Sequence, residues 1–217
     1  MRSVLVHTVN PLFYVDIRKD GKIISGKPTS TPDFATDYKN SNKCVQKFAF
    51  TLLCEVPFWK DEHEVKSIIA SWVPDFYFPA VFVFGENKTF GHRTQSLIVD
   101  VNNKGVVDAG MVIEFAATGQ VKNPSIINVV TREALKVNVS LNAGDIIKIN
   151  TNFGEKSITK IVEGIGTNAF KFLDDEYDVF LQLHPGQNLL RYDAEEGLEL
   201  LNVYISKSNF YVDEVAG

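Results

Sequence analysis

The chain has 217 residues, of which 45% are hydrophobic and 23% are charged, and its formal net charge is −5. This length suffices for one large or two small domains with a buried core, and the composition is that of an ordinary globular protein. The negative charge disfavours specific nucleic-acid binding, because no basic surface is available to neutralise phosphates. The apolar stretches are far shorter than the ~20 residues of a membrane-spanning helix, and the N-terminus is too polar for a signal peptide, so we expect synthesis in the cytoplasm and no membrane segment.

The first elements expected along the chain are β-strands. Residues 12–18 and 23–25 are apolar runs expected to form a strand pair, and Asp20-Gly21 lies between them, which is a strong signal for a β-hairpin. Residues 26–43 are polar and contain two prolines, so they predict a long loop. Residues 45–56 predict a further strand.

Residues 62–73 predict the single helix of the protein. Asp61 provides an N-cap acceptor three residues before Glu64, as in a capping box, and Pro74 would end the helix. The apolar residues follow at the spacing of one helix face, at Val65, Ile68, Ile69 and Trp72. The aromatic stretch 75–79 marks a domain boundary, so we expect one domain over residues 1–78 and a second over residues 79–217.

From residue 80 onward the pattern predicts strands only. A turn signal recurs about every 8–12 residues, a spacing typical of an antiparallel β-sandwich or jelly roll. Leu135 to Leu141 alternates strictly, which predicts one buried and one exposed face, and Ala143-Gly144-Asp145 supplies the next turn. The expected strands are 80–84, 95–101, 111–115, 125–130, 135–141, 146–149, 158–162, 170–173, 179–183, 189–192 and 198–205.

No arrangement of residues predicts an enzyme, a cofactor or a metal site. No nucleophile, zinc or phosphate-loop motif occurs, and the four histidines are not spaced as metal ligands. These histidines are His7, His63, His92 and His184. The acidic groups at Asp174–Glu176 and Glu195–Glu196 lie between predicted strands, where carboxylates more often solvate a turn than bind calcium.

Two further kinds of residue have simple interpretations. Cys44 and Cys54 could pair across a hairpin, but a single pair in a chain of this length favours two reduced, buried thiols. Asn87 and Asn138 match the N-glycosylation pattern by letter. Without a secretion signal, we interpret both matches as chance.

Carbohydrate binding is the alternative function that a β-sandwich requires us to consider. Sugar sites use exposed aromatic rings beside polar groups. Trp59 and Trp72 both precede the predicted sandwich, which leaves Tyr177 and Tyr192 as the candidate platform. Packing between strands is the competing interpretation of these two tyrosines. The alternative function would be attachment to a host cell wall.

Several turn-and-strand phrases resemble those of phage distal tail proteins, the siphovirus-type tail component family. In the N-terminal part, these are Arg2-Ser-Val-Leu, Asn10-Pro11 and the phrase Cys54-Glu-Val-Pro-Phe-Trp59. In the C-terminal part, they are Asn102–Gly105, Asp108–Gly110, Gly119–Asn128, Ala143–Ile149 and Leu183–Asn188. Each phrase is weak alone, but together they occur in the family's order.

The resemblance implies a structural protein of a phage or prophage tail tip. Residues 1–78 would form part of an N-terminal ring or hub domain with one helix, and residues 79–217 a galectin-like sandwich. Members of the family form a ring, hexameric in the assembled tail, that joins the tail-tube protein to baseplate and receptor-binding proteins. They usually carry roughly a hundred further residues before the point where this sequence starts, about the size of a domain.

Overall fold

The computed structural model describes residues 14–36, 39, 41, 46–68, 71–74, 91–94 and 98–212. The chain forms two compact units. Residues 63–209 form one of them, which we call the sandwich unit. Residues 1–62 and 210–217 form the other, the small unit. This division falls after Glu62, whereas the sequence predicted a boundary after residue 78. The C-terminal segment, residues 210–217, belongs to the small unit and not to the sandwich unit.

The small unit contains a five-stranded antiparallel sheet and a separate two-stranded one. The sheet begins with the hairpin predicted around Asp20-Gly21. Both residues have positive φ angles, 52° and 72°, as the tight two-residue turn requires. The five strands are β1 (Val15–Lys19), β2 (Lys22–Pro28), β5 (Leu52–Leu53), β6 (Trp59–Asp61) and β22 (Phe210–Tyr211). The separate pair is β3 (Asp33–Phe34) with β4 (Phe48–Ala49), so the strand expected over residues 45–56 is broken into two short pieces.

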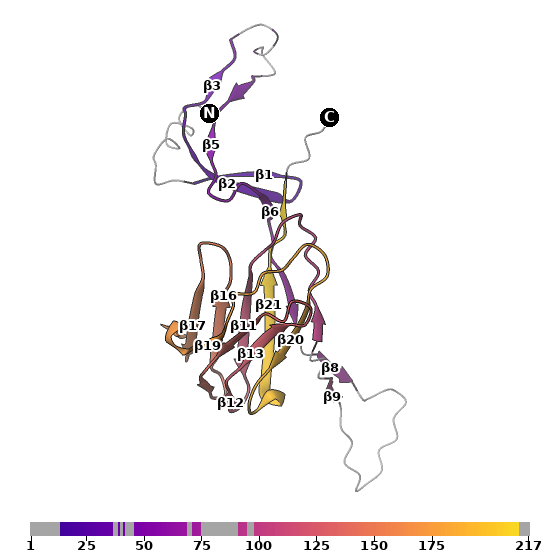
Figure 1. Ribbon diagram of the computed structural model, residues 1–217. Helices are drawn as coiled ribbons and strands as arrows, with labels where there is room; N and C mark the ends of the chain where they lie inside the picture. Colours follow the sequence, from indigo (N-terminus) through magenta and orange to yellow (C-terminus); the bar gives the residue numbers. More distant parts are fainter. Residues whose placement is uncertain are drawn as a thin grey trace. The chain divides into compact units, whose positions relative to one another are not determined.

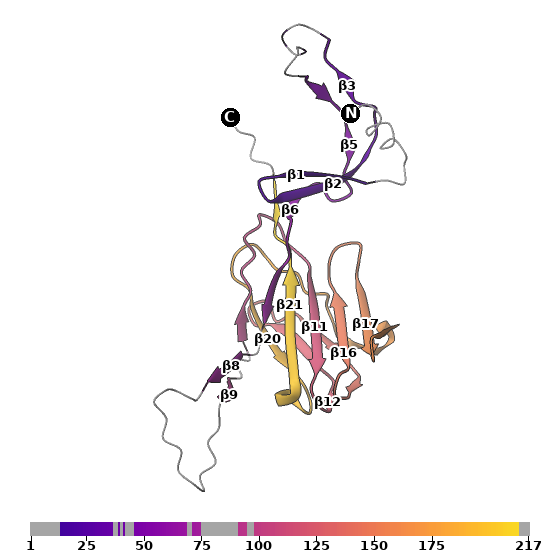
Figure 2. The same ribbon diagram turned by 180° about the vertical axis from the view of Figure 1, so that it is seen from behind.

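The sandwich unit is built on two antiparallel sheets, as predicted. The larger has the spatial order β18 (Ile165–Asn168), β17 (Ser157–Val162), β16 (Ile146–Asn150), β11 (Met111–Ala117), β21 (Leu201–Lys207) and β7 (Val65–Ile68). Both ribbon views show β17, β16, β11 and β21 side by side (Figures 1 and 2). The second sheet has the order β10 (Ile98–Asp100), β20 (Leu189–Asp193), β13 (Ser125–Asn128), β14 (Ala134–Val137) and β19 (Leu173–Asp178). Two small pairs, β12 (Val121–Lys122) with β15 (Ser140–Leu141) and β8 (Ser71–Pro74) with β9 (Gly91–Thr94), complete the described strands.

Alternating side chains of the two sheets meet in one apolar core. Along β11 every second side chain is buried, including Met111, Ile113 and Phe115, each with no exposed surface. Leu190 and Ile126 contribute from the opposite sheet. The mainly β fold class and the period-two pattern that predicted it are therefore confirmed.

The alternating stretch 135–141 keeps its predicted burial but is not one strand. Leu135, Val137, Val139 and Leu141 are all buried. The Val139 N–H bonds to the Val137 carbonyl at 3.0 Å, which turns the chain, so β14 ends at Val137 and β15 begins at Ser140. The stretch thus passes from the five-stranded sheet to the β12–β15 pair while its apolar face stays toward the core.

The helix predicted over residues 62–73 is wrong. Its described residues form β7, which pairs with β21, and β8, which pairs with β9. The predicted N-cap residue, Asp61, lies in β6 opposite Lys22. The segment is rich in β-branched and aromatic residues, and β21 offers it a row of backbone partners, so sheet pairing outweighs the helical spacing.

Three other strand predictions differ from the structure. Residues 170–172 form a turn of 3₁₀-helix before β19, and residues 198–200 form another before β21. Residues 179–183 form no regular strand, although Leu181 and Leu183 are buried. The strand expected over residues 80–84 lies outside the described residues.

Candidate interaction surfaces

The two tyrosines considered as a carbohydrate platform differ in exposure. Tyr177, on β19, is 43% exposed, whereas Tyr192, on β20, is only 1% exposed and packs in the core. A ring that faces the core cannot stack on a sugar in solvent. The predicted pair therefore does not form a platform, and Tyr192 has the packing role that was the competing interpretation.

Two of the acidic residues considered as a calcium site converge on a lysine. The Lys136 ammonium lies 2.8 Å from a carboxylate oxygen of Glu195 and 3.8 Å from one of Asp174. Asn123 and Asn138 donate their side-chain N–H groups to the same two carboxylates, at 2.8 Å each. We call these five residues the Lys136 network. The Lys136 ammonium lies between the two carboxylates and offsets part of their charge, so the position that a calcium ion would need is already taken.

The pKa values in the Lys136 network follow from these contacts. The hydrogen bond from Asn138 lowers the pKa of Asp174 below the ordinary value, and the backbone N–H of Glu176 adds to this. The hydrogen bond from Lys136 lowers the pKa of Glu195, with Asn123 adding to it. In turn, the hydrogen bond to Glu195 raises the pKa of Lys136. The network is a structural tie between β14, β19 and the turn after β20.

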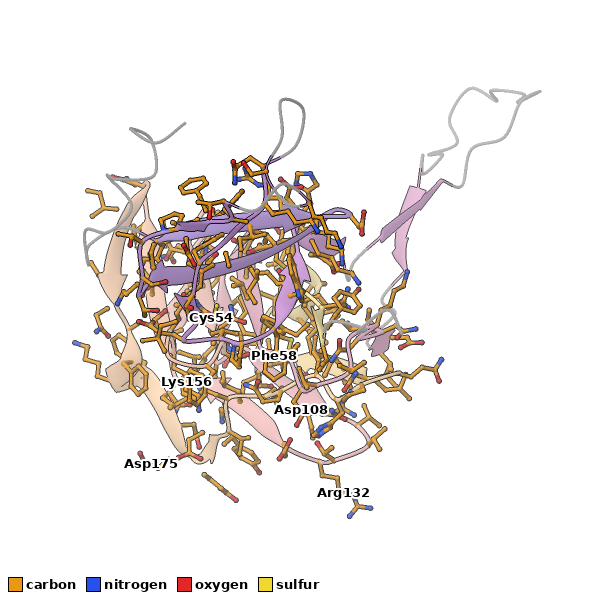
Figure 3. The ribbon with its side chains drawn as sticks, turned by 90° about the horizontal axis from the view of Figure 1, so that it is seen from above. Cys54, Phe58, Asp108, Arg132, Lys156 and Asp175 are labelled. Atoms are coloured by element: carbon orange, nitrogen blue, oxygen red, sulfur yellow. The ribbon has the colours of Figure 1, made fainter. Side chains whose placement is uncertain are left out.

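The remaining acidic side chains of these two groups belong to the surface. Glu196 forms an exposed ion pair with Lys122 at 3.0 Å. Asp175 and Glu176 are exposed, and Asp175, like Arg132 in the β13–β14 turn, extends outward from the ribbon (Figure 3). Within the described parts of the chain, no group of three or more His, Cys, Asp or Glu side chains is arranged to hold a metal ion.

The histidines and cysteines show no shared site among the described residues. His184 lies 2.9 Å from Asp108 through its Nδ1 atom, and both side chains are about half exposed. His63 is exposed. Cys54 is a half-buried free thiol (Figure 3). His7, Cys44 and Asn87 lie outside the described residues, and so does the side chain of His92.

A cluster of buried polar side chains at one end of the sandwich was not predicted from the sequence. Asn103 donates to the carbonyls of Val107 and Leu183 at 2.9 and 2.8 Å. The side-chain amide of Asn188 donates to the backbone carbonyls of His184, Gly186 and Val101. Its side-chain oxygen accepts the His184 N–H at 2.9 Å. These bonds add to the isolated β-bridges between the two irregular segments, Asn103 with Gly186 and Ala109 with Leu183, and help to satisfy their backbone carbonyls.

The same end holds a buried lysine. Lys207 is 6% exposed, and its ammonium donates to the carbonyl of Asn102 and, at 2.7 Å, to the side-chain oxygen of Asn209. Asn209 also accepts the Lys104 N–H at 2.9 Å. The Lys207 clip, as we call these contacts, fixes the chain just before it leaves the sandwich unit at residue 210. Alternation along β21 predicts that Lys207 faces inward, which is the signal that could have identified it.

The small unit has the opposite character. Among its described residues, Ile23 is the buried apolar side chain, at 8% exposure. Several large apolar side chains are exposed instead, at Tyr14, Phe48, Leu53, Val56 and Val212. A sheet with so little buried apolar surface is a candidate for contact with other chains.

Comparison with known protein families finds one family that the sandwich unit resembles. Residues 104–203 match the family of the siphovirus-type tail component, C-terminal domain. This part of the chain is similar to that family. The match spans most of the sandwich unit, including β11 to β21 apart from the end of β21. No curated protein matches the sequence.

Solved structures give a likeness over more of the chain. The structure of the SPP1 Dit (gp 19.1) protein, described as a paradigm of the hub adsorption apparatus in phages that infect Gram-positive bacteria, aligns with a TM-score of 0.64 at 12% identity. The alignment covers 97% of this chain and 70% of that protein, so the two share a fold. Two structures of the phage P2 baseplate in its activated conformation, with Ca and with Sr, align with TM-scores of 0.44 at 11% and 10% identity. Each alignment covers 89% of this chain and 67% of the other.

Of the two buried asparagines, Asn188 lies within the region that matches the tail component domain, and Asn103 immediately precedes it. Asn103 lies in the phrase Asn102–Gly105, and Asn188 ends the phrase Leu183–Asn188. The hydrogen bonds of these amides explain why the two phrases hold asparagine, since only a short side chain with both a donor and an acceptor can satisfy the neighbouring backbone. In the structure, each phrase marks a point where irregular backbone is tied to the sandwich. Within the described parts of the chain, no helix is long and apolar enough to cross a membrane.

Proposed function

We propose that the protein is the distal tail hub of a phage or prophage, a structural component of the tail tip that joins the tail tube to the baseplate and receptor-binding apparatus. In this role it makes and breaks no bonds. The observation that carries the proposal is the match of residues 104–203 to the C-terminal domain of a siphovirus-type tail component. The shared fold with the SPP1 Dit protein supports it over nearly the whole chain.

The small unit supplies the self-assembly surface in this proposal. Leu53 is 61% exposed and Val56 42% exposed, and the described residues beside them bury little apolar surface. Exposed apolar patches are typical of protein interfaces, so copies of this unit would gain their burial from one another. We propose that they form a hexameric ring, which binds the tail-tube protein on one side and baseplate and receptor-binding proteins on the other.

Electron microscopy of the purified full chain, alone and mixed with the tail-tube protein of the same phage, tests this proposal. We expect closed rings, and gold-labelled antibody against the protein at the tip of intact particles. A chain that stays monomeric under both conditions, and is missing from the particles, would overturn the hub proposal.

A matched pair of variants tests the role of the small unit. Leu53→Glu places a charge on β5, and we expect it to abolish rings while the far-ultraviolet circular dichroism stays unchanged. Val106→Glu is the control, because Val106 is 58% exposed in the sandwich unit, close to the 61% of Leu53. Equal ring formation by the two variants would exclude the surface around Leu53 as the contact.

A further inference from the structure

The two edge strands on one side of the sandwich unit differ in how they are protected. β19 carries Asp174, Asp175, Glu176 and Asp178, and its register with β14 is shifted by a bulge. Charges and bulges are the usual devices that prevent another strand from pairing with an edge. β18 has neither: its sequence is Ile-Gly-Thr-Asn, its four pairs with β17 are regular, and all four residues are exposed.

The register of the β17–β18 hairpin identifies the free backbone groups of β18. Glu163 and Gly164 form the two-residue turn, with φ angles of 51° and 81°, so Ile165 and Thr167 direct their N–H and carbonyl groups to β17. The Ala169 N–H continues this pattern by donating to the Ile158 carbonyl at 2.9 Å. Gly166 and Asn168, which alternate with these residues, therefore direct their backbone N–H and carbonyl groups away from the sheet.

This pattern is self-complementary. When two β18 strands lie antiparallel with Thr167 opposite Thr167, Gly166 of each faces Asn168 of the other, and all four outward pairs of groups are satisfied. We propose that β18 pairs with β18 of a second copy of this chain about a two-fold axis, which joins two six-stranded sheets into one. Main-chain pairing of this kind is a recurrent mode of protein association.

The side chains around β18 fit the same register. It brings Glu163, in the hairpin turn, near Lys171 of the second copy, which lies in the 3₁₀ turn that follows β18, so we expect an ion pair at each end of the new strand pair. Both residues are exposed, and neither has an ion pair with the described residues of its own chain. Ile165, 70% exposed, would be covered by the second hairpin. The charges, the apolar side chain and the free backbone groups thus all select an antiparallel second copy.

The two-fold contact is distinct from ring formation. A cyclic ring contains only head-to-tail contacts, whereas a strand that pairs with its own copy makes an isologous contact. The β18 contact therefore joins two copies that are not neighbours in one ring. It does not depend on the proposed tail function, and it uses only the sandwich unit.

Disulfide cross-linking of the full chain tests the contact directly. In a background with Cys44→Ser and Cys54→Ser, Thr167→Cys would place two thiols on the axis. The Cα atoms of such a non-hydrogen-bonded pair are about 4.5 Å apart, within the range of a disulfide. We expect a covalent dimer to form about tenfold faster than with Val130→Cys, a control at a 69% exposed position in the β13–β14 turn. Equal rates for the two variants would overturn the proposal.

A charge exchange provides the second test, read as the rate of the Thr167→Cys cross-link. Lys171→Glu would set two pairs of like charges across the axis, and we expect the cross-link to slow about five- to tenfold. Adding Glu163→Lys should restore the rate, because the ion pairs return with opposite polarity. Lys156→Glu is the matched control: both lysines lie over a phenylalanine ring of their own chain, Lys171 at 4.9 Å and Lys156 at 5.2 Å. A slow double variant, or an equal effect of Lys156→Glu, would contradict the register.

Discussion

The two units of this protein are both built from antiparallel strands, but they bury very different amounts of apolar surface. The sandwich unit encloses one core between two sheets, with side chains such as Phe115 and Ile149 fully buried. The small unit has a single five-stranded sheet, and among its described residues only Ile23 is a buried apolar side chain. Apolar burial is the main stabilising contribution to folding, so the sandwich unit has its own source of stability and the small unit has little.

This difference explains how one chain can combine a stable domain with an assembling one. A sheet that leaves Phe48 and Leu53 exposed gains stability when another chain covers them. The sandwich unit encloses a core of its own, although it also exposes apolar side chains such as Phe153 and Ile165. The comparison therefore predicts that core substitutions in the sandwich act mainly on folding, and that substitutions at the exposed apolar side chains of the small unit act mainly on association.

Phe115→Ala should have the largest effect on stability. Phe115 lies in β11 between Ile147 of β16 and Val203 of β21, and truncation would leave a cavity between the two sheets. We expect a loss of about 3–5 kcal/mol in the free energy of unfolding of the sandwich. Urea unfolding combined with hydrogen exchange would report the two units separately, with faster exchange in residues 63–209. Ile23→Ala, the matched change in the small unit, should cost about 1–2 kcal/mol, and equal losses would refute the contrast between the units.

Lys207→Met should have an intermediate effect. The substitution keeps much of the aliphatic side chain but removes the ammonium, which leaves the Asn102 carbonyl without this donor. We expect a loss of about 2 kcal/mol, since hydrogen bonds from charged groups contribute about 1.5–3 kcal/mol each. Hydrogen exchange should increase most at residues 101–105, where Asn209 and Lys207 hold the backbone. Lys104→Met, at an exposed side chain of the same segment, is the control, and an equal loss there would show that the Lys207 clip contributes nothing.

The local sequence pattern predicted most of the sandwich, because buried apolar side chains alternate with more exposed ones along its strands. The strands around β11, β13, β16, β17 and β20 follow from alternation and from turn residues such as Gly144, whose φ angle is +90°. The same alternation could have predicted whether Tyr192 is an exposed sugar platform or a core residue. It lies two residues from the core residue Leu190 on one strand, so the two share a face and Tyr192 must be buried as well.

The errors arose where partners distant in sequence determine the structure. Residues 65–74 carry apolar side chains at helical spacing, but both strands of this segment are selected by partners. β7 pairs with β21, well over a hundred residues later, and β8 pairs with β9. The break within residues 135–141 is of the same kind. Alternation predicts which side chains are buried, but it does not predict that Ser140 and Leu141 leave one sheet and pair with β12 in another.

Lowering the pH should produce the smallest difference in stability between the two units. In the small unit, hydrogen bonds from Tyr14 and Lys27 lower the pKa of Glu55, and in the sandwich the Lys136 network lowers the pKa of Asp174 and Glu195. A carboxyl with a lowered pKa in the folded state stabilises the protein above its unfolded pKa, and this contribution is lost as the pH falls through the folded value.

The expected loss therefore begins below about pH 4.5, where unfolded carboxyls start to protonate. It should be steeper in the sandwich, which holds two such groups among its described residues, against one among those of the small unit. The lysines do not alter this window. The pKa values of Lys27 and Lys136 are raised, so their contribution is complete throughout the acid range and is lost only in strong alkali. The measurement is the change in the urea unfolding midpoint of each unit between pH 7 and pH 3. Lys136→Met should reduce this change in the sandwich unit, and Lys27→Met should reduce it in the small unit. If Lys136→Met leaves the slope for the sandwich unchanged, the hydrogen bond from Lys136 is not what lowers the pKa of Glu195.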